Sequence, residues 1–148
     1  MSQIIFICII LYMATTGLTR TVSKCELVYE LRRHGFPEYQ MRDLVCLVRA
    51  ESMFETDVID GPNYDGSYDW GLFQINDRFW CNPIGAPGKG CNVHCNDLVS
   101  DNITATLNCA ITIINHQGLD ASPGWVKNCK GKWQPDLNCD CNCTNTFY

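Results

Sequence analysis

The cysteines constrain the fold of this chain more than any other feature, because eleven occur in 148 residues. Cys8 lies in an apolar N-terminal segment, which leaves ten cysteines in the rest of the chain. An even number of cysteines in a short exported chain is typical of a disulfide framework. We therefore expect one small, loop-rich domain that folds in an oxidising compartment.

The N-terminal segment has the pattern of a signal peptide. Residues 4–11 are apolar throughout, and no charged side chain precedes Arg20. This run is too short to span a bilayer and fits the core of a signal peptide, with an uncleaved signal anchor as the alternative. We expect residues 1–19 to be removed and residues 20–148 to form a secreted, extracellular domain without a further membrane segment.

The charge balance is acidic, with 16 Asp and Glu against 11 Lys and Arg and a net charge of −5. A negative protein gains no attraction for nucleic acid or for an anionic cell envelope. We therefore expect neither nucleic acid nor a membrane as a partner, and we expect the domain to act as a monomer.

Three long helices are expected from apolar residues that recur at helical spacing. Residues 24–34 form the first helix, and residues 39–54 form a better buried second helix with Glu51 in its last turns. Residues 103–116 carry apolar side chains around much of the helix circumference, which indicates a central, buried position. A shorter helical stretch is expected near Trp125.

Turn and strand signals lie between the second and third helices. Asp65-Gly66 is a hairpin turn signal, and Trp70 to Ile75 has the composition of a strand. Residues 81–97 are rich in Cys, Gly, Pro and Asn and are expected to form a loop. The expected fold class is therefore α+β, with several helices and one small antiparallel sheet.

Two acidic residues stand in contrasting surroundings. Glu51 ends an apolar helix, whereas Asp69 lies on a strand among polar neighbours. Glycoside hydrolysis needs one carboxylic acid that stays protonated and one carboxylate that stays ionised. An apolar setting favours the first state and a hydrogen-bonded, partly wet setting favours the second. The pattern alone is weak evidence, because acidic residues near helix ends are usually solvated or form caps.

A long stretch of the chain resembles c-type lysozymes, the family that also contains alpha-lactalbumin. The run from Asn63 to Asn76, NYDGSYDWGLFQIN, is similar to the family's signature stretch, and the match extends from about Arg20 to Cys139. The step of eighteen residues from Glu51 to Asp69 is more like that of insect members. The other matching pieces are Lys24-Cys25-Glu26-Leu27, Arg33-His34-Gly35, Ala50-Glu51-Ser52, Trp80-Cys81-Asn82, Asp101-Asn102-Ile103-Thr104 and Cys129-Lys130-Gly131.

The resemblance implies a helical domain and a small antiparallel β-hairpin subdomain, stapled by disulfides, with a cleft between them. Glu51 falls on the family's general acid, and Asp69 falls on the carboxylate that stabilises or attacks the sugar carbon. A set of polar side chains near them is expected to line the cleft, with the alternative that these side chains only hold the hairpin together. A pair of aromatic side chains is expected to stack on the faces of sugars, and one further position is expected to contact the substrate. These positions are Asn63, Asp65, Ser67, Gln74 and Asn76 for the polar set, Phe79 and Trp80 for the aromatic pair, and Ala121.

The resemblance also implies four disulfides. They are Cys25–Cys139, Cys46–Cys129, Cys81–Cys95 and Cys91–Cys109. A zinc ligand set of Cys91, His94 and Cys95 is the less favoured alternative. One branch of the family binds calcium, but the corresponding positions here lack the anionic oxygens that calcium needs. Those positions are Ser100, Asn102, Ala105 and Thr106. We expect no metal and no cofactor.

Two features depart from the family pattern. Ser122 replaces the tryptophan usually found seven residues before the cysteine matching Cys129, so we expect more water at Glu51, a smaller rise of its pKa and an acidic optimum. Cys141 and Cys143 lie in an extra tail, residues 139–148, and either bond each other, bond another chain or bind a soft metal. Sequons at Asn102 and Asn142 are candidate glycosylation sites.

The expected function is a muramidase that hydrolyses the β-1,4 link between N-acetylmuramic acid and N-acetylglucosamine in peptidoglycan, with retention. Chitooligosaccharides are the related substrates. The alternative is a non-catalytic or weakly active glycan-binding relative, such as a reproductive protein, but such relatives tend to lose the carboxylate pair and this chain keeps it. Of the digestive and antibacterial roles, the acidic charge weakly favours digestion or a specialised tissue role.

Overall fold

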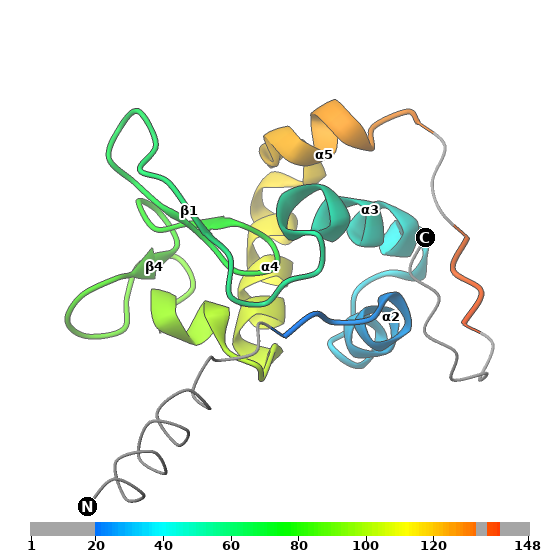
Figure 1. The fold of residues 1–148 in the computed structure, drawn as a ribbon, viewed down its shortest axis with the longest axis horizontal. Helices are drawn as coiled ribbons and strands as arrows, with labels where there is room; N and C mark the ends of the chain where they lie inside the picture. Colours follow the sequence, from blue (N-terminus) through cyan, green and yellow to red (C-terminus); the bar gives the residue numbers. More distant parts are fainter. Residues whose placement is uncertain (1–19, 133–135, 140–148) are drawn as a thin grey trace, which may run out of the picture.

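The computed structural model describes residues 20–132 and 136–139. The expected signal segment, residues 1–19, and the tail cysteines Cys141 and Cys143 lie outside these residues. Two groups of elements make up the molecule. Figure 1 shows the helices α2, α3 and α5 on one side and the strands β1 and β4 on the other, with α4 between them.

The helices follow the expected order. They are α2 (Lys24–Arg33), α3 (Met41–Ser52), α4 (Thr104–Gln117) and α5 (Pro123–Asn128), with short 3-10 helices η2 (Glu38–Gln40), η3 (Cys95–Val99) and η4 (Leu119–Ala121). The expected helices over 24–34, 39–54 and 103–116 are thus found with ends that differ by one or two residues. Ser23 begins α2, because its hydroxyl accepts the N–H of Glu26.

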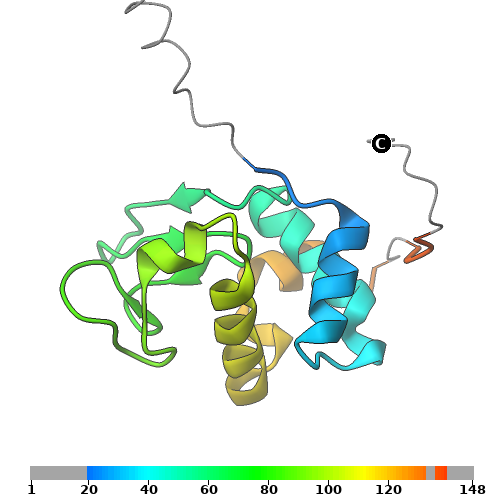
Figure 2. The ribbon, with the colours of Figure 1, turned by 90° about the horizontal axis from the view of Figure 1, so that it is seen from below.

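The helix α4 lies between the two groups of elements, as the turned view in Figure 2 shows. The expected central position of this helix is found, but the expected burial holds only for its N-terminal half. Leu107 and Ala110 are buried, whereas Ile113 and Ile114 are only half-buried and line a cleft. The apolar side chains of α4 therefore pack in the core on one side of the helix and line the cleft on the other.

The principal sheet has three strands, each of two residues. The strands β1 (Ile59–Asp60), β2 (Asp69–Trp70) and β3 (Ile75–Asn76) pair antiparallel in that order. A second, two-residue parallel pair joins β4 (Cys81–Asn82) to β5 (Val93–His94) inside the expected loop. The α+β class is confirmed, and the antiparallel sheet is the small one expected.

The expectation of one strand from Trp70 to Ile75 is wrong, because a turn interrupts it. Gly71 adopts a φ of +69°, and its position leaves no room for a Cβ against the carbonyl of Leu98. Gln74 also has a positive φ and donates its backbone N–H to the carbonyl of Gly71 at 2.9 Å. A close approach to η3 thus bends the chain between β2 and β3.

One core connects the two groups of elements. Most of its fully buried side chains come from the three long helices, the turn after β2 and η3. They include Leu27, Leu31, Met41, Leu44, Leu72, Leu98 and Leu107. Among the described residues, no helix is long and apolar enough to cross a membrane.

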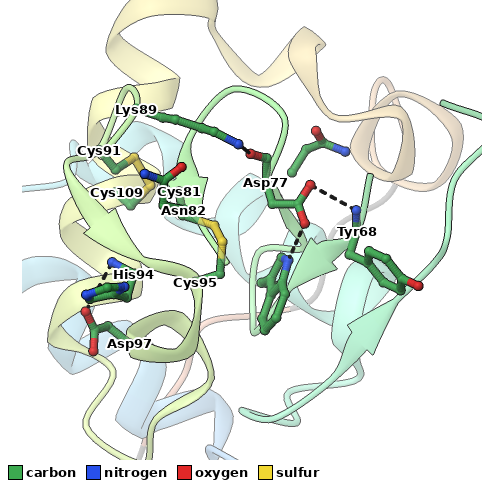
Figure 3. The surroundings of a disulfide bond; sticks show 12 residues. Tyr68, Asp77, Cys81, Asn82, Lys89, Cys91, His94, Cys95, Asp97 and Cys109 are labelled. Atoms are coloured by element: carbon green, nitrogen blue, oxygen red, sulfur yellow. Dashed lines mark hydrogen bonds between the residues drawn. A yellow bond between two sulfur atoms is a disulfide. The ribbon is translucent and has the colours of Figure 1, made fainter. Parts of the chain in front are cut away.

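Four disulfides cross-link the structure. They are Cys25–Cys139, Cys46–Cys129, Cys81–Cys95 and Cys91–Cys109, the same pairs that the resemblance implies. Figure 3 shows the last two near Asp77, a buried carboxylate that accepts hydrogen bonds from the backbone N–H of Tyr68 and the indole of Trp70. The bonds thus hold the β4–β5 loop against the core.

The zinc alternative is wrong. Cys91 and Cys95 belong to two different disulfides, and His94 forms a capping box with Asp97 at the start of η3 (Figure 3). Across residues 20–132 and 136–139, no group of three or more His, Cys, Asp or Glu side chains is arranged to hold a metal.

Candidate active site

Glu51 lies in the last turn of α3, with its carboxyl group half-buried at the surface of a cleft. The helix ends at Ser52, because the next residue, Met53, adopts a left-handed conformation with a φ of 52°. The hydroxyl of Ser122 donates a hydrogen bond to Oε1 of Glu51 at 2.5 Å, and the backbone N–H of Gly124 also donates to the carboxyl group.

Several neighbouring groups shift the pKa of Glu51 in opposite directions. Burial raises the pKa of its carboxyl group, because desolvation disfavours the charged form. The hydrogen bonds from Ser122 and Gly124 lower the pKa, and the negative charges of Asp69 and Asp60 raise it. Burial is the largest of these influences, and the pKa lies above its ordinary value. Glu51 therefore has the character of an acid that holds its proton.

Gly124 brings the start of α5 against the carboxyl group of Glu51. A Cβ at this position would overlap the carboxyl group, so a residue with a side chain would push Glu51 aside. The indole of Trp125 points elsewhere and donates to Oδ1 of Asp43 at 3.0 Å. Trp125 thus does not substitute for the ring that the family usually carries at position 122.

Asp69 lies on β2 and is held by two amides. The Nδ2 group of Asn63 donates to its Oδ2 at 2.8 Å, and the Nδ2 group of Asn76 donates to its Oδ1 at 2.9 Å. Asn76 is the residue directly opposite Asp69 on β3, which explains its reach. Both oxygens act as acceptors, which is the role of an ionised carboxylate.

A second polar group lies behind this carboxylate. Ser67 is buried, and its hydroxyl oxygen accepts from both asparagine amides, Asn63 at 3.1 Å and Asn76 at 2.8 Å. The same hydroxyl donates to Asp65 at 2.6 Å. Hydrogen bonds from Ser67 and then from Arg78 lower the pKa of Asp65 to about 2. The network keeps the two asparagines oriented toward Asp69.

A cleft of about 570 Å³ runs between the helices and the sheet. Glu51 lines its helical wall and Asp69 lines its sheet wall. Amide side chains, an aromatic pair and apolar side chains of the helices line the cleft. These lining residues include Asn63, Gln74, Asn76, Phe79, Trp80, Leu47, Ile113, Ile114 and Leu119.

Comparison with known proteins shows the family to which this chain belongs. The model of the C-type lysozyme/alpha-lactalbumin family matches residues 20–141. The chain belongs to this family. It is 45% identical over 135 residues to a lysozyme of Bombyx mori, which covers 91% of this chain and 96% of the relative. It is 44% identical over 119 residues to a lysozyme of Galleria mellonella, covering 80% and 98%.

A lysozyme of Hyalophora cecropia is 42% identical over 141 residues, which are 95% of this chain and the full length of the relative. The resemblance to insect members of the c-type lysozyme family is thus confirmed. By family and by these relatives, the chain is a hydrolase of the lysozyme class.

The structure brings most of the expected c-type lysozyme positions to one cleft. The expected residues that line it are Glu51, Asp69, Asn63, Gln74, Asn76, Phe79, Trp80 and Ala121. Asp65 and Ser67 are not among the lining residues, and they support Asn63 and Asn76 from behind. Some of the polar hairpin residues therefore lie at the cleft and others hold the hairpin together, and their binding of a sugar stays a prediction.

Three contributors to the site carried no signal in the sequence. Gly124 and Asp60 act on Glu51, and Ile113 lines the cleft opposite the sheet. Gly124 follows a proline and is indistinguishable from a turn glycine, and Asp60 is one of several acidic residues around a loop. Their roles depend on contacts between segments that lie far apart in the chain.

Proposed function

We propose that this chain is a secreted muramidase that hydrolyses the β-1,4 link between N-acetylmuramic acid and N-acetylglucosamine in peptidoglycan, with retention of configuration. One observation carries the proposal: two carboxyl groups, Glu51 and Asp69, line the two walls of one cleft in opposite chemical surroundings. Chitooligosaccharides, which share the β-1,4 linkage, are the soluble substrates.

Glu51 serves as the general acid. Its half-buried carboxyl group holds a proton at a pH where an exposed glutamic acid has lost it. The acid delivers this proton to the glycosidic oxygen as the bond to the leaving sugar breaks. After the leaving sugar departs, the resulting carboxylate takes a proton from the water that completes hydrolysis. A buried glutamic acid opposite a solvated aspartate is the established pattern of lysozymes in this family, and the proposed roles follow it.

Asp69 serves as the ionised partner. The amides of Asn63 and Asn76 fix both of its oxygens, so the carboxylate does not need to reorient as positive charge develops on the sugar. In a retaining reaction this carboxylate attacks the anomeric carbon, and water later displaces it. Retention predicts that the first product formed has the β configuration, which proton NMR of fresh product measures.

The cleft supplies sugar-binding groups around the pair. Phe79 is 61% exposed and Trp80 lies beside it at the cleft surface, where aromatic rings stack on the apolar faces of sugars. The backbone near Ala121 lies along the same cleft and contacts substituents of the sugar rings. The amide of Gln74 also lies at the cleft but is used within the protein, since its Nε2 group donates to the carbonyls of Val58 at 3.2 Å and Gly71 at 2.9 Å and its Oε1 atom is buried.

Export completes the proposal. Residues 1–19 act as a signal peptide and are removed, and residues 20–148 act outside the cell as a monomer, with the tail from 139 onward as an addition to the family domain. The net charge of −5 favours a digestive or specialised tissue role over attack on intact anionic envelopes.

The test is hydrolysis of purified peptidoglycan and of a chitooligosaccharide by Glu51→Gln and Asp69→Asn. Each amide keeps the shape of the acid, but Glu51→Gln has no proton to donate and Asp69→Asn has no charge to stabilise the sugar. We expect losses of at least about 10²-fold in kcat for both variants. Thermal unfolding should be unchanged in Glu51→Gln and slightly lower in Asp69→Asn, because that variant loses one of the two hydrogen bonds from Asn63 and Asn76. Hydrolysis at the wild-type rate by either variant would refute its assignment.

A further inference from the structure

In the described part of the chain, four amide side chains line the cleft, and three of them have no N–H left for a ligand. A side-chain amide carries two N–H donors. Asn63 and Asn76 each spend both donors on the hydroxyl oxygen of Ser67 and the carboxylate of Asp69. Gln74 spends both donors on two backbone carbonyls. These three amides therefore shape the cleft but cannot donate to a bound sugar.

Gln117 is the fourth of these amides. It is the last residue of α4, it is exposed, and it lines the cleft. Within residues 20–132 and 136–139, its side chain makes no hydrogen bond. Among the described residues that line the cleft, the only other side-chain N–H without a protein acceptor is the indole of Trp80. The amide of Gln117 thus offers two donors and one acceptor to a ligand.

Helical spacing brings Gln117 to the cleft. Ala110, Ile113, Ile114 and Gln117 follow one another at intervals of three, one and three residues, so they share one face of α4, and all four line the cleft. At the rise of an α-helix, Gln117 lies about 10 Å along the axis from Ala110. A ligand on this wall therefore contacts apolar side chains and, at the end of the face, a single amide.

We propose that Gln117 is a sugar-binding residue of the helical wall and that it recognises the acetamido group of an N-acetylated sugar. The inference rests on the substrate class of the proposed function. An acetamido group carries one N–H and one carbonyl oxygen, and the amide of Gln117 supplies the matching acceptor and donors. The methyl group of the acetamide is apolar, as are the neighbouring side chains of Ile113 and Ile114. Gln117 acts in binding and takes no part in bond cleavage.

The experiment measures the affinity for the hexamer of N-acetylglucosamine in the Glu51→Gln background, where the sugar stays intact. Gln117→Met keeps the length and helix propensity of glutamine but has no amide. The matched control is Asn115→Leu, which removes an exposed amide of the same helix that does not line the cleft. We expect a Kd about 3- to 10-fold higher in Gln117→Met, as for the loss of one neutral hydrogen bond, and an unchanged Kd in the control. In the active chain, Gln117→Met should raise KM and leave kcat unchanged.

The side-chain amide signals in a ¹⁵N–¹H NMR spectrum give a second readout. The signals of Gln117 are identified by their loss in Gln117→Met, and the hexamer should shift them more than it shifts those of Asn115. An unchanged Kd in Gln117→Met, an equal loss in the control, or unshifted signals of Gln117 would overturn the inference and leave the proposed function standing. The proposed function fails separately if the wild type hydrolyses neither peptidoglycan nor the hexamer, whether or not Gln117 binds the sugar.

Discussion

The hydroxyl of Ser122 joins the start of α5 to the acid at the end of α3. This hydroxyl donates to Oε1 of Glu51 at 2.5 Å, and the hydroxyl oxygen of Ser122 accepts the backbone N–H of Trp125 at 3.1 Å. One side chain thus caps α5 and binds the carboxyl group of the acid. A hydrogen bond to a carboxylate is stronger than one to a carboxylic acid, so Ser122 favours loss of the proton from Glu51.

The substitution Ser122→Ala should extend activity to higher pH. Removing the donor raises the pKa of Glu51, so the acid form persists further into the neutral range and the alkaline limb of the pH–rate profile moves up. The variant also loses the cap of α5, at a cost of about 1 kcal/mol. The measurements are kcat against pH on a soluble oligosaccharide, together with thermal unfolding.

Ser23→Ala is the matched control for this prediction. Ser23 caps α2 by accepting the N–H of Glu26 at 3.1 Å. Its removal should lower stability by a similar amount without moving the pH–rate profile. An alkaline limb that moves equally in both variants would mean that lost stability, not the bond to Glu51, sets the profile.

Gly124→Ala should lower activity with little effect on folding. Its φ is not in the left-handed region, and alanine is a better helix former than glycine, so the backbone tolerates the change. The added methyl group would overlap the carboxyl group of Glu51 and displace it. A misplacement of about 1 Å at a reacting group costs about 10²-fold in rate. Wild-type kcat in this variant would show that Glu51 moves without consequence.

The charge of the protein should make its action on cell walls depend on salt. The net charge of −5 repels anionic envelopes, and salt screens that repulsion over about 10 Å at 0.1 M. At pH 7, where the net charge is −5, the rate on intact bacterial walls should therefore rise between about 0.01 M and 0.1 M salt, while the rate on a neutral oligosaccharide serves as the control. A wall rate that falls over this range, as for a basic enzyme, would contradict the prediction.

The helices were predictable because their signals are local. Apolar spacing placed α2, α3 and α4 to within two residues, and Ser23 and Ser122 begin their helices as polar caps do. The strand predicted from Trp70 to Ile75 was wrong because its cause is long-range: Gly71 turns where the chain meets the carbonyl of Leu98, 27 residues later. No property of the residues between β2 and β3 reveals that contact.

The site was predictable from the resemblance more than from the residues. The carboxylate pair stood out only weakly by its surroundings, and its placement as the two catalytic groups remains a proposal. The absence of a tryptophan at position 122 predicted a smaller rise in the pKa of Glu51, because more water was expected to reach its carboxyl group. The structure adds a direct hydrogen bond, which depends on how η4 and Pro123 orient the serine, and that orientation is not encoded in a local pattern.

The disulfides cross-link one wall of the cleft more than the other. Cys46–Cys129 ties α3 to the end of α5, so the wall that carries Glu51 is a cross-linked body, whereas no cysteine occurs between Cys46 and Cys81, the stretch that carries Asp69. The hairpin wall is therefore held to the helical wall by packing and by the chain itself. The distance between the carboxyl groups of Glu51 and Asp69 is therefore set by packing and not by a covalent cross-link between the two walls.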